Sequence, residues 1–165
     1  MSTLGSFIWS IADQLRGPYR PNQYGTVILP FTILRRLDCI LEPDRAVVRE
    51  LAARYENPNR LRIEVKKATG RTFYNTSNYE FANLLADADG LADNLADYVD
   101  RFSADVDVFE YFDFKKEILA LEKAGLLREI VKSFGAVDLH PDVVSNSDMG
   151  DAFEYIIRKF NEAAN

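Results

Sequence analysis

Apolar residues recur every three or four positions along most of the chain, which is the spacing of one face of an α-helix. No stretch alternates apolar and polar residues at every second position, as a half-buried strand would. The pattern therefore predicts an all-α fold, a compact bundle of about eight or nine helices with no essential sheet. The predicted helices cover residues 4–15, 22–41, 44–55, 58–69, 81–85, 91–102, 114–121, 127–134 and 147–160.

Capping residues, glycine and proline mark where several of these helices begin and end. Asn57 and Pro58 are typical of an N-cap and a first helical position, and Gly70 is a typical C-terminal stop. We expect the Asp44 side chain to cap the helix that follows it. Pro30 falls inside helix 22–41 and is expected to kink it, because proline lacks a backbone N–H.

The helix predicted over 22–41 is apolar on nearly all sides after residue 27, which is typical of a central, buried helix. Arg35 lies three residues before Asp38, and we expect an internal salt bridge because a buried cation needs a partner. Cys39 is expected to pack as an inert side chain. His140 lies in a short connection, where we expect a structural hydrogen bond rather than catalysis.

A chain of 165 residues has the length of one domain and can bury an ordinary core. One cysteine and one histidine exclude a disulfide framework and a Cys/His zinc site. The eight glycines lie too far apart for a phosphate-binding loop. No apolar run approaches the ~20 residues of a membrane span, and the first residues lack the basic region of a secretory signal. We predict a cytoplasmic domain, away from membranes, with no catalytic, cofactor-binding or metal-binding residues.

Charge divides the chain into two halves. The basic half, residues 1–75, holds 12 Lys and Arg against 7 Asp and Glu, whereas the acidic half, residues 76–165, holds 8 against 19. Such asymmetry is typical of chains that contact nucleic acid on one side, although surface charge also serves solubility. The ten acids between Glu80 and Asp113 are expected to form a solvated face, with Asp93, Asp97 and Asp100 together on one helix.

Several strings resemble the modification subunits of type I restriction–modification systems. FIWSIADQLRG (7–17) and QYGTVILPFTILRRLD (23–38) resemble the first helices of those subunits. FYNTSNYEF (73–81) fits the middle of the same domain. The end of the domain is matched by KAGLL (123–127), DLHP (138–141) and the Met-Gly-x-x-Phe-Glu helix at 149–160.

This resemblance implies that residues 1–165 form a single helical N-terminal domain, with the catalytic methyltransferase domain absent and expected after residue 165. In the family that domain methylates adenine in DNA with S-adenosylmethionine, through a glycine-containing loop and an Asn-Pro-Pro-aromatic motif. Neither motif occurs here, so we expect no cofactor and no methyl transfer in this segment. The implied partners are double-stranded DNA, the specificity subunit and a second modification subunit; whether a restriction (nuclease) subunit joins them stays open.

The resemblance also implies that the domain clamps DNA and contributes to assembly while the adjoining domain methylates. Between residues 45 and 71 the chain holds eight Lys and Arg against three acids. Arg45 and Arg49 lie one helical turn apart, as do Arg62 and Lys66, so each pair is expected to face one phosphate strand. The candidate contacts to the DNA backbone or to a partner are Arg16, Arg20, Arg45, Arg49, Arg60, Arg62, Lys66, Lys67 and Arg71.

Other interpretations of the same charges remain open. The basic stretch can be a solvated face, or it can pair with the acidic segment between Glu80 and Asp113. The domain can also be an adaptor that binds the specificity subunit or its twin without contacting DNA. A third class, an acidic mimic of DNA, is contradicted by the basic first half of the chain.

Overall fold

Every regular element in residues 3–164, the part of the chain that the computed structural model describes, is helical. The only β-pairing in that part is two isolated bridges, one of which joins Asn75 to Phe102. The all-α prediction is therefore confirmed. The α-helices are α1 (Thr3–Leu15), α2 (Tyr24–Leu41), α3 (Arg45–Arg54), α4 (Pro58–Thr69), α5 (Phe81–Leu84), α6 (Leu91–Asp100), α7 (Val108–Tyr111), α8 (Phe114–Lys123), α9 (Leu127–Gly135) and α10 (Asn146–Ala164), and two 3-10 turns, η1 (Pro21–Gln23) and η2 (Glu42–Asp44), flank α2.

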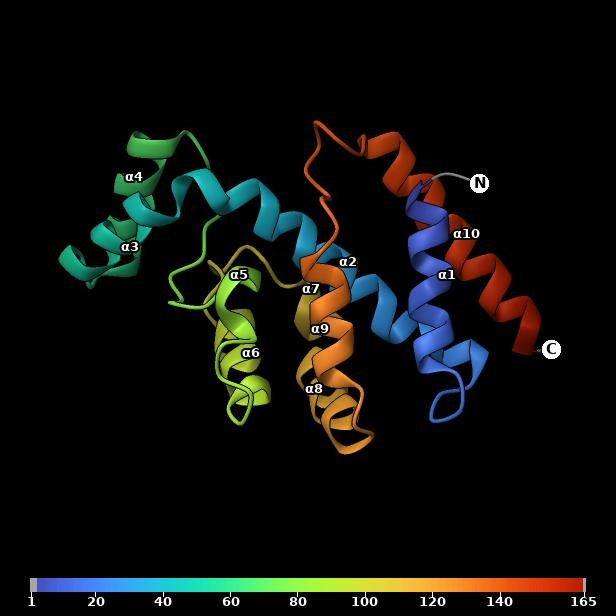
Figure 1. Ribbon diagram of the computed structural model, residues 1–165. Helices are drawn as coiled ribbons and strands as arrows, with labels where there is room; N and C mark the ends of the chain where they lie inside the picture. Colours follow the sequence, from blue (N-terminus) through green and yellow to red (C-terminus); the bar gives the residue numbers. More distant parts are fainter. Residues whose placement is uncertain (1–2, 165) are drawn as a thin grey trace.

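Helix α2 lies at the centre of the molecule, as its apolar circumference predicts. Figure 1 shows it running diagonally, with α5, α6, α8 and α9 below it, α1 and α10 at one end, and α3 and α4 at the other. Val27, Ile28, Phe31 and Leu34 on α2 are fully buried. Removing one such side chain from water contributes roughly 1.5–3 kcal/mol. The helix continues through Pro30, which is itself buried.

A row of aromatic rings crosses the core beneath α2. Phe31 contacts Phe114 edge to face, with ring centroids 4.8 Å apart, and stacks on Phe134 at 5.3 Å. The row is extended in one direction by Phe7 and in the other by Phe109, Phe102 and Tyr98. Phe109 belongs to α7, a single turn that the sequence pattern missed because four residues are too few to show a helical period.

Helix α10 packs on α2 and η1. The indole Nε1 of Trp9 on α1 donates a hydrogen bond of 2.9 Å to the Tyr155 hydroxyl on α10. In the stripe predicted as core, Met149 and Ile156 are buried, whereas Ile157 is 51% exposed. The last residue of that stripe, Phe160, lies outside the residues whose side chains the structure describes.

The caps around α3 and α4 confirm one prediction and overturn another. The Asn57 side chain accepts hydrogen bonds from the backbone N–H groups of Asn59 and Arg60, and Gly70 ends α4 in the left-handed conformation. Asp44 occupies the N-cap position of α3, but its side chain makes no capping hydrogen bond. Its carboxylate instead accepts from Arg71 at 2.8 Å, a partner 27 residues away that the local pattern cannot show.

Candidate functional site

The α3–α4 hairpin (residues 45–69) projects from one end of the molecule (Figure 1). It has a small hydrophobic cluster of its own, made by Val48, Leu61 and Val65 together with Tyr74 from the following segment. Helices α3 and α4 pack on each other, and α3 also packs on η2. The hairpin is therefore joined to the rest of the domain mostly through the residues at its base.

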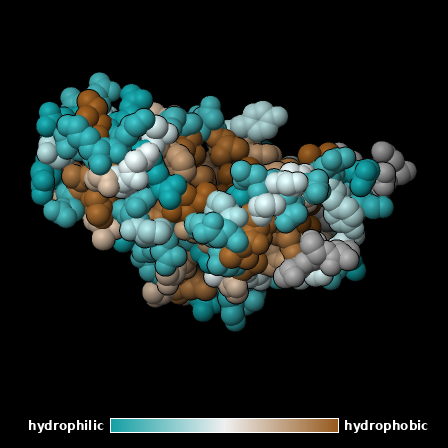
Figure 2. Space-filling view, turned by 90° about the horizontal axis from the view of Figure 1, so that it is seen from above, coloured by the Kyte–Doolittle hydropathy of each residue, from teal (hydrophilic) through white to brown (hydrophobic). Residues whose placement is uncertain are grey.

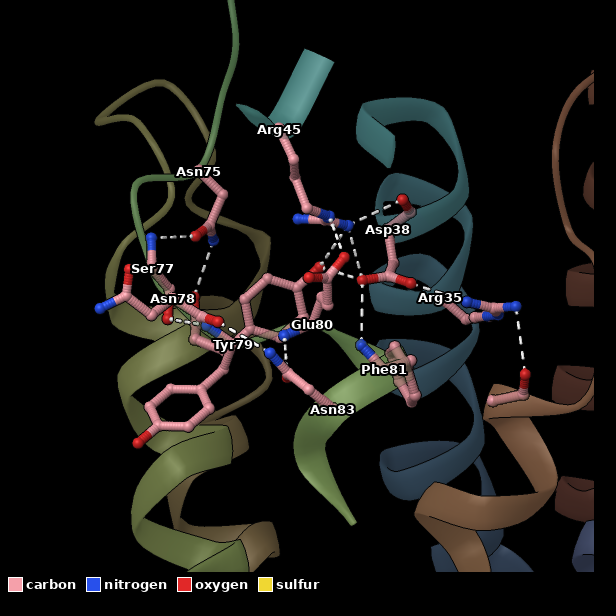
Figure 3. Close-up of polar contacts among 12 residues, drawn as sticks. Arg35, Asp38, Arg45, Asn75, Ser77, Asn78, Tyr79, Glu80, Phe81 and Asn83 are labelled. Carbon is pink, nitrogen blue, oxygen red and sulfur yellow. Dashed lines mark hydrogen bonds and ion pairs between the residues drawn. The ribbon is translucent and has the colours of Figure 1, made fainter. Parts of the chain in front are cut away.

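The base of the hairpin is a buried ionic network, which we call the Asp38 cluster (Arg35, Asp38, Arg45, Glu80 and Tyr98). Figure 3 shows the Arg45 side chain pointing from the start of α3 toward Asp38 on α2 and Glu80 before α5. One Arg45 nitrogen lies 2.7 Å from Asp38 Oδ1, and its Nε lies 2.8 Å from Glu80 Oε2. The side chains of Arg45 and Asp38 are only 7% and 6% exposed. The junction between α2 and α3 thus meets the distant segment before α5 around one buried guanidinium.

Further donors complete the surroundings of Asp38. The Tyr98 hydroxyl donates to Asp38 Oδ1, and the backbone N–H of Phe81 donates to the same oxygen at 3.3 Å. Arg35 donates to the other oxygen, Oδ2, at 2.7 Å, so the predicted internal salt bridge is confirmed. A carboxylate with this many donors is stable in the interior because hydrogen bonds replace its lost hydration.

Burial and charge act together on the titration of this cluster. Burial raises the pKa of Tyr98 well above its ordinary value, and the Asp38 carboxylate raises it further, so the phenol keeps its proton and remains a donor. Burial alone would lower the pKa of Arg45, but the acidic groups around it raise the pKa above its ordinary value. Arg45 therefore stays charged inside the domain.

Three of the predicted contact residues hold the hairpin in place. Arg45 is buried, so the expectation that it faces a phosphate strand together with Arg49 is wrong, and its side chain is not accessible to DNA. Arg49 donates to the Ser77 carbonyl at 3.1 Å and pairs with Glu80 at 3.2 Å. Arg71 is half-buried against Asp44. Pairing between the basic stretch and the acidic segment, left open by the sequence, thus occurs at Glu80.

The other basic residues of the hairpin lie on its surface. Arg62 and Lys66, four residues apart on one face of α4, are exposed and form no ion pair among the residues that the structure describes. Arg60 and Lys67 are also exposed and share the Glu64 carboxylate, at 3.1 and 3.6 Å. Seen from above, the hairpin end carries mostly hydrophilic residues, whereas hydrophobic ones gather along the middle of the molecule (Figure 2).

Two candidates, Arg16 and Arg20, lie far from the hairpin, near the end of α1. Arg16 pairs with Asp13 at 3.0 Å, and both side chains are well exposed. Arg20 is exposed at the start of η1 and makes no ion pair within the described part of the chain. These two arginines are at the end of α2 opposite to the one that carries the hairpin (Figure 1). The nine candidates therefore do not form one continuous surface.

Sequence reasoning missed the positioning role of the Arg35–Arg36 pair. Beyond its bond to Asp38, Arg35 donates to the carbonyls of Gly135 and Val137 at the end of α9. Arg36 donates to the carbonyls of Leu139 and Val144 and to the Asn146 side chain at the start of α10. The two side chains thereby hold the connection between α9 and α10 against α2. Backbone carbonyls carry no side-chain signature, so no sequence pattern could identify these acceptors.

Of the remaining single residues, His140 has the predicted structural role, whereas Asp97 departs from the solvated face expected for it. Cys39 is buried, and burial raises the pKa of its thiol, which favours the protonated form over the nucleophilic thiolate. His140 Nδ1 accepts a hydrogen bond from the Asp142 backbone N–H at 3.0 Å, the predicted structural role. Asp93 and Asp100 are solvated, whereas Asp97 is half-buried and accepts from the Ser77 hydroxyl.

Two chemical properties of the described residues bear on function. In residues 3–164, no group of three or more His, Cys, Asp and Glu side chains is placed to hold a metal ion. No helix in the same part of the chain combines the length and the apolar character that crossing a bilayer requires. What distinguishes the surface is the distribution of charge, above all on the hairpin.

Comparison with known families shows to which family the chain belongs. A family model described as the HsdM N-terminal domain matches residues 4–134, which run from the first turn of α1 to the last turn of α9. The chain belongs to the HsdM N-terminal domain family. HsdM is the modification subunit of type I restriction–modification systems, so the resemblance found in the sequence is confirmed. No curated protein and no solved structure matches the chain.

The HsdM match includes the first helices, the middle segment and the Lys-Ala-Gly-Leu-Leu motif. The Asp-Leu-His-Pro motif and helix α10 lie beyond the matched residues. In the structure these two segments are nevertheless joined to the HsdM_N helices, through the hydrogen bonds of Arg36 and the contact of Trp9 with Tyr155.

Proposed function

We propose that this HsdM N-terminal domain holds the DNA backbone through the exposed face of the α3–α4 hairpin. In the intact modification subunit, this contact would position the duplex while the adjoining domain methylates adenine with S-adenosylmethionine. An enzyme that acts on a base inside a duplex must extrude that base, and a second contact helps to hold the distorted DNA. Phosphate contacts supply such positioning without reading the sequence.

The observation that carries the proposal is the pair of Arg62 and Lys66. Both are exposed on one face of α4, and neither forms an ion pair in the described part of the chain. Neighbouring Arg60 and Lys67 are 58% and 69% exposed and share the Glu64 carboxylate, which is only 16% exposed. Phosphates can therefore reach Arg62 and Lys66 without breaking an ion pair, and Arg60 and Lys67 lie on the same helix.

The fixed base of the hairpin supports the same proposal. Arg45 and Arg49 bind the start of α3 to Asp38 and Glu80, and Arg71 binds the segment after α4 to Asp44. These contacts set the direction in which α4 presents its cations. A pre-positioned surface loses less conformational entropy on binding than a mobile one.

In this proposal, other parts of the assembly carry out sequence recognition, cofactor binding and methylation. Sequence recognition would belong to the specificity subunit, and a second modification subunit would contact the opposite side of the duplex. S-adenosylmethionine would bind the adjoining domain, since this segment lacks the motifs for it. We expect the assembly to work in the cytoplasm, where its DNA is.

The test measures binding of a fluorescein-labelled duplex to the 165-residue chain at several low salt concentrations. Arg62→Ala/Lys66→Ala removes the two unpaired cations of α4. Lys123→Ala/Arg128→Ala removes two exposed cations elsewhere and is the matched control. We expect the first variant alone to weaken binding equally for all duplex sequences, and to reduce the slope of log K against log salt by about 2.

Two results would contradict the proposal. Equal weakening by both variants would mean that only net charge matters. Absence of any DNA affinity at low salt, together with retained binding of the specificity subunit, would show that the domain is an adaptor.

A further inference from the structure

A pocket of about 400 Å³ opens beside α7, on a part of the surface that the DNA proposal does not use. It lies between the end of α6, the turn that follows, α7 and the start of α8. Its floor is apolar and largely aromatic, and is formed by Val99, Phe102, Val106, Phe109 and Phe114. Its three rings belong to the aromatic row and are only 1–9% exposed, so the pocket rests on the packed core.

The rim of this pocket is acidic. Asp100, Asp107, Glu110 and Asp113 line it, together with a single cation, Lys115. The Lys115 ammonium lies 3.0 Å from Asp100 Oδ1 and neutralises that carboxylate. The other three carboxylates form no ion pair among the described residues, and all three side chains are exposed. A ligand that complements this pocket would therefore carry a positive charge and also have apolar surface.

We propose that this pocket receives an arginine side chain from a basic segment of a partner protein. A guanidinium is planar and weakly hydrated, so it can enter a pocket with an apolar floor while its N–H groups reach carboxylates at the rim. A hard metal ion would need a compact set of oxygen ligands, which the described residues do not provide. Nucleic acid would be repelled by the rim carboxylates.

Two exposed side chains on the helices that line the pocket, α7 and α8, indicate a partner larger than a small amine. Tyr111 follows Glu110 on α7 and is 85% exposed. Leu119 on α8 is 61% exposed. Tyrosine and arginine are the residue types that dominate binding energy in protein interfaces, where they sit at the centre of the contact. A polypeptide that inserts an arginine can cover Tyr111 at the same time.

The test titrates the 165-residue chain, labelled with ¹⁵N, with a short peptide in which arginines are separated by glycine, serine and leucine. A second peptide carries citrulline, the uncharged isostere, at each arginine. We expect the arginine peptide alone to shift amide resonances of residues 99–115. Asp107→Asn/Glu110→Gln should weaken its affinity at least tenfold, whereas Asp89→Asn/Asp93→Asn, which removes two exposed acids outside the pocket, should leave it nearly unchanged.

Tyr111→Ala provides an independent variant, because an 85% exposed side chain contributes little to folding. This variant should bind the arginine peptide more weakly, while the thermal stability of the domain stays unchanged. Each of three results would overturn the proposal. Both charge-neutralising variants could lower the affinity for the arginine peptide equally, or the citrulline peptide could bind as tightly. The amide resonance shifts could also fall outside residues 99–115. A dimer of the chain that Asp107→Asn/Glu110→Gln dissociates would overturn the proposal too, since the occupant would then be a second copy. Because the DNA test changes α4 instead, the two proposals can fail separately.

Discussion

Replacing Arg45 with methionine removes the central cation of the Asp38 cluster while keeping a long apolar side chain. Asp38 would retain Arg35 at 2.7 Å, and Glu80 would retain Arg49 at 3.2 Å. Both carboxylates, however, would lose their most deeply buried partner, since the Arg45 side chain is only 7% exposed. The substitution therefore leaves two partly compensated negative charges at the base of the hairpin.

Breaking a buried ion pair by removing one partner costs about 3–5 kcal/mol. The remaining arginines place this variant at the lower end, at about 3 kcal/mol of unfolding free energy. A domain of this type has a total stability of about 5–15 kcal/mol, so the loss is a large fraction of it. At this chain length it corresponds to a decrease of about 6–12 °C in the unfolding temperature.

Urea unfolding followed by far-ultraviolet circular dichroism measures this loss. Arg54→Met is the matched control, because Arg54 forms an exposed pair with Glu50, with side chains 59% and 70% exposed. Such surface pairs contribute about 0–1 kcal/mol, so the control should be nearly neutral. If Arg45→Met costs no more than Arg54→Met, the Asp38 cluster does not stabilise the base of the hairpin and our reasoning is refuted.

Two further predictions concern a turn and a titration. Gly70→Ala should destabilise the domain by about 1 kcal/mol, because the residue has a φ of +78°, although an added Cβ would meet no other atom. The control Gly150→Ala has open space and an ordinary helical φ, so it should not lower the unfolding free energy in the same urea experiment. Equal effects of the two variants would contradict this account. Burial, and then the neighbouring Glu117, raises the pKa of Tyr19 from 10.0 to about 12. Since the folded phenol holds its proton more tightly than the unfolded one, this stabilisation is complete below pH 10.0 and is lost as the pH rises through about 12. Tyr19→Phe should therefore make the unfolding free energy fall less steeply across that range, and an unchanged slope would disprove the link.

Much of the fold could be predicted because it depends on neighbours along the chain. Amphipathic stripes placed nearly all the helices, and the caps of α4 at Asn57 and Gly70 were correct. The Arg35–Asp38 salt bridge was also predicted, since two residues three apart meet on any helix. Asp44 shows the limit of this reasoning: its position at the start of α3 was predicted correctly, but its carboxylate binds the distant Arg71 instead of capping the helix.

What the sequence by itself determined is the helical class, the central position of α2 and the family to which the chain belongs. It could not tell Arg45 from Arg62, because each is an arginine on a short amphipathic helix in the same basic stretch. Only the tertiary structure placed one beside Asp38 and Glu80 in the interior and left the other in water. Helix formation depends on interactions within a turn or two, whereas the burial of a charge depends on which distant segments the packing brings to it.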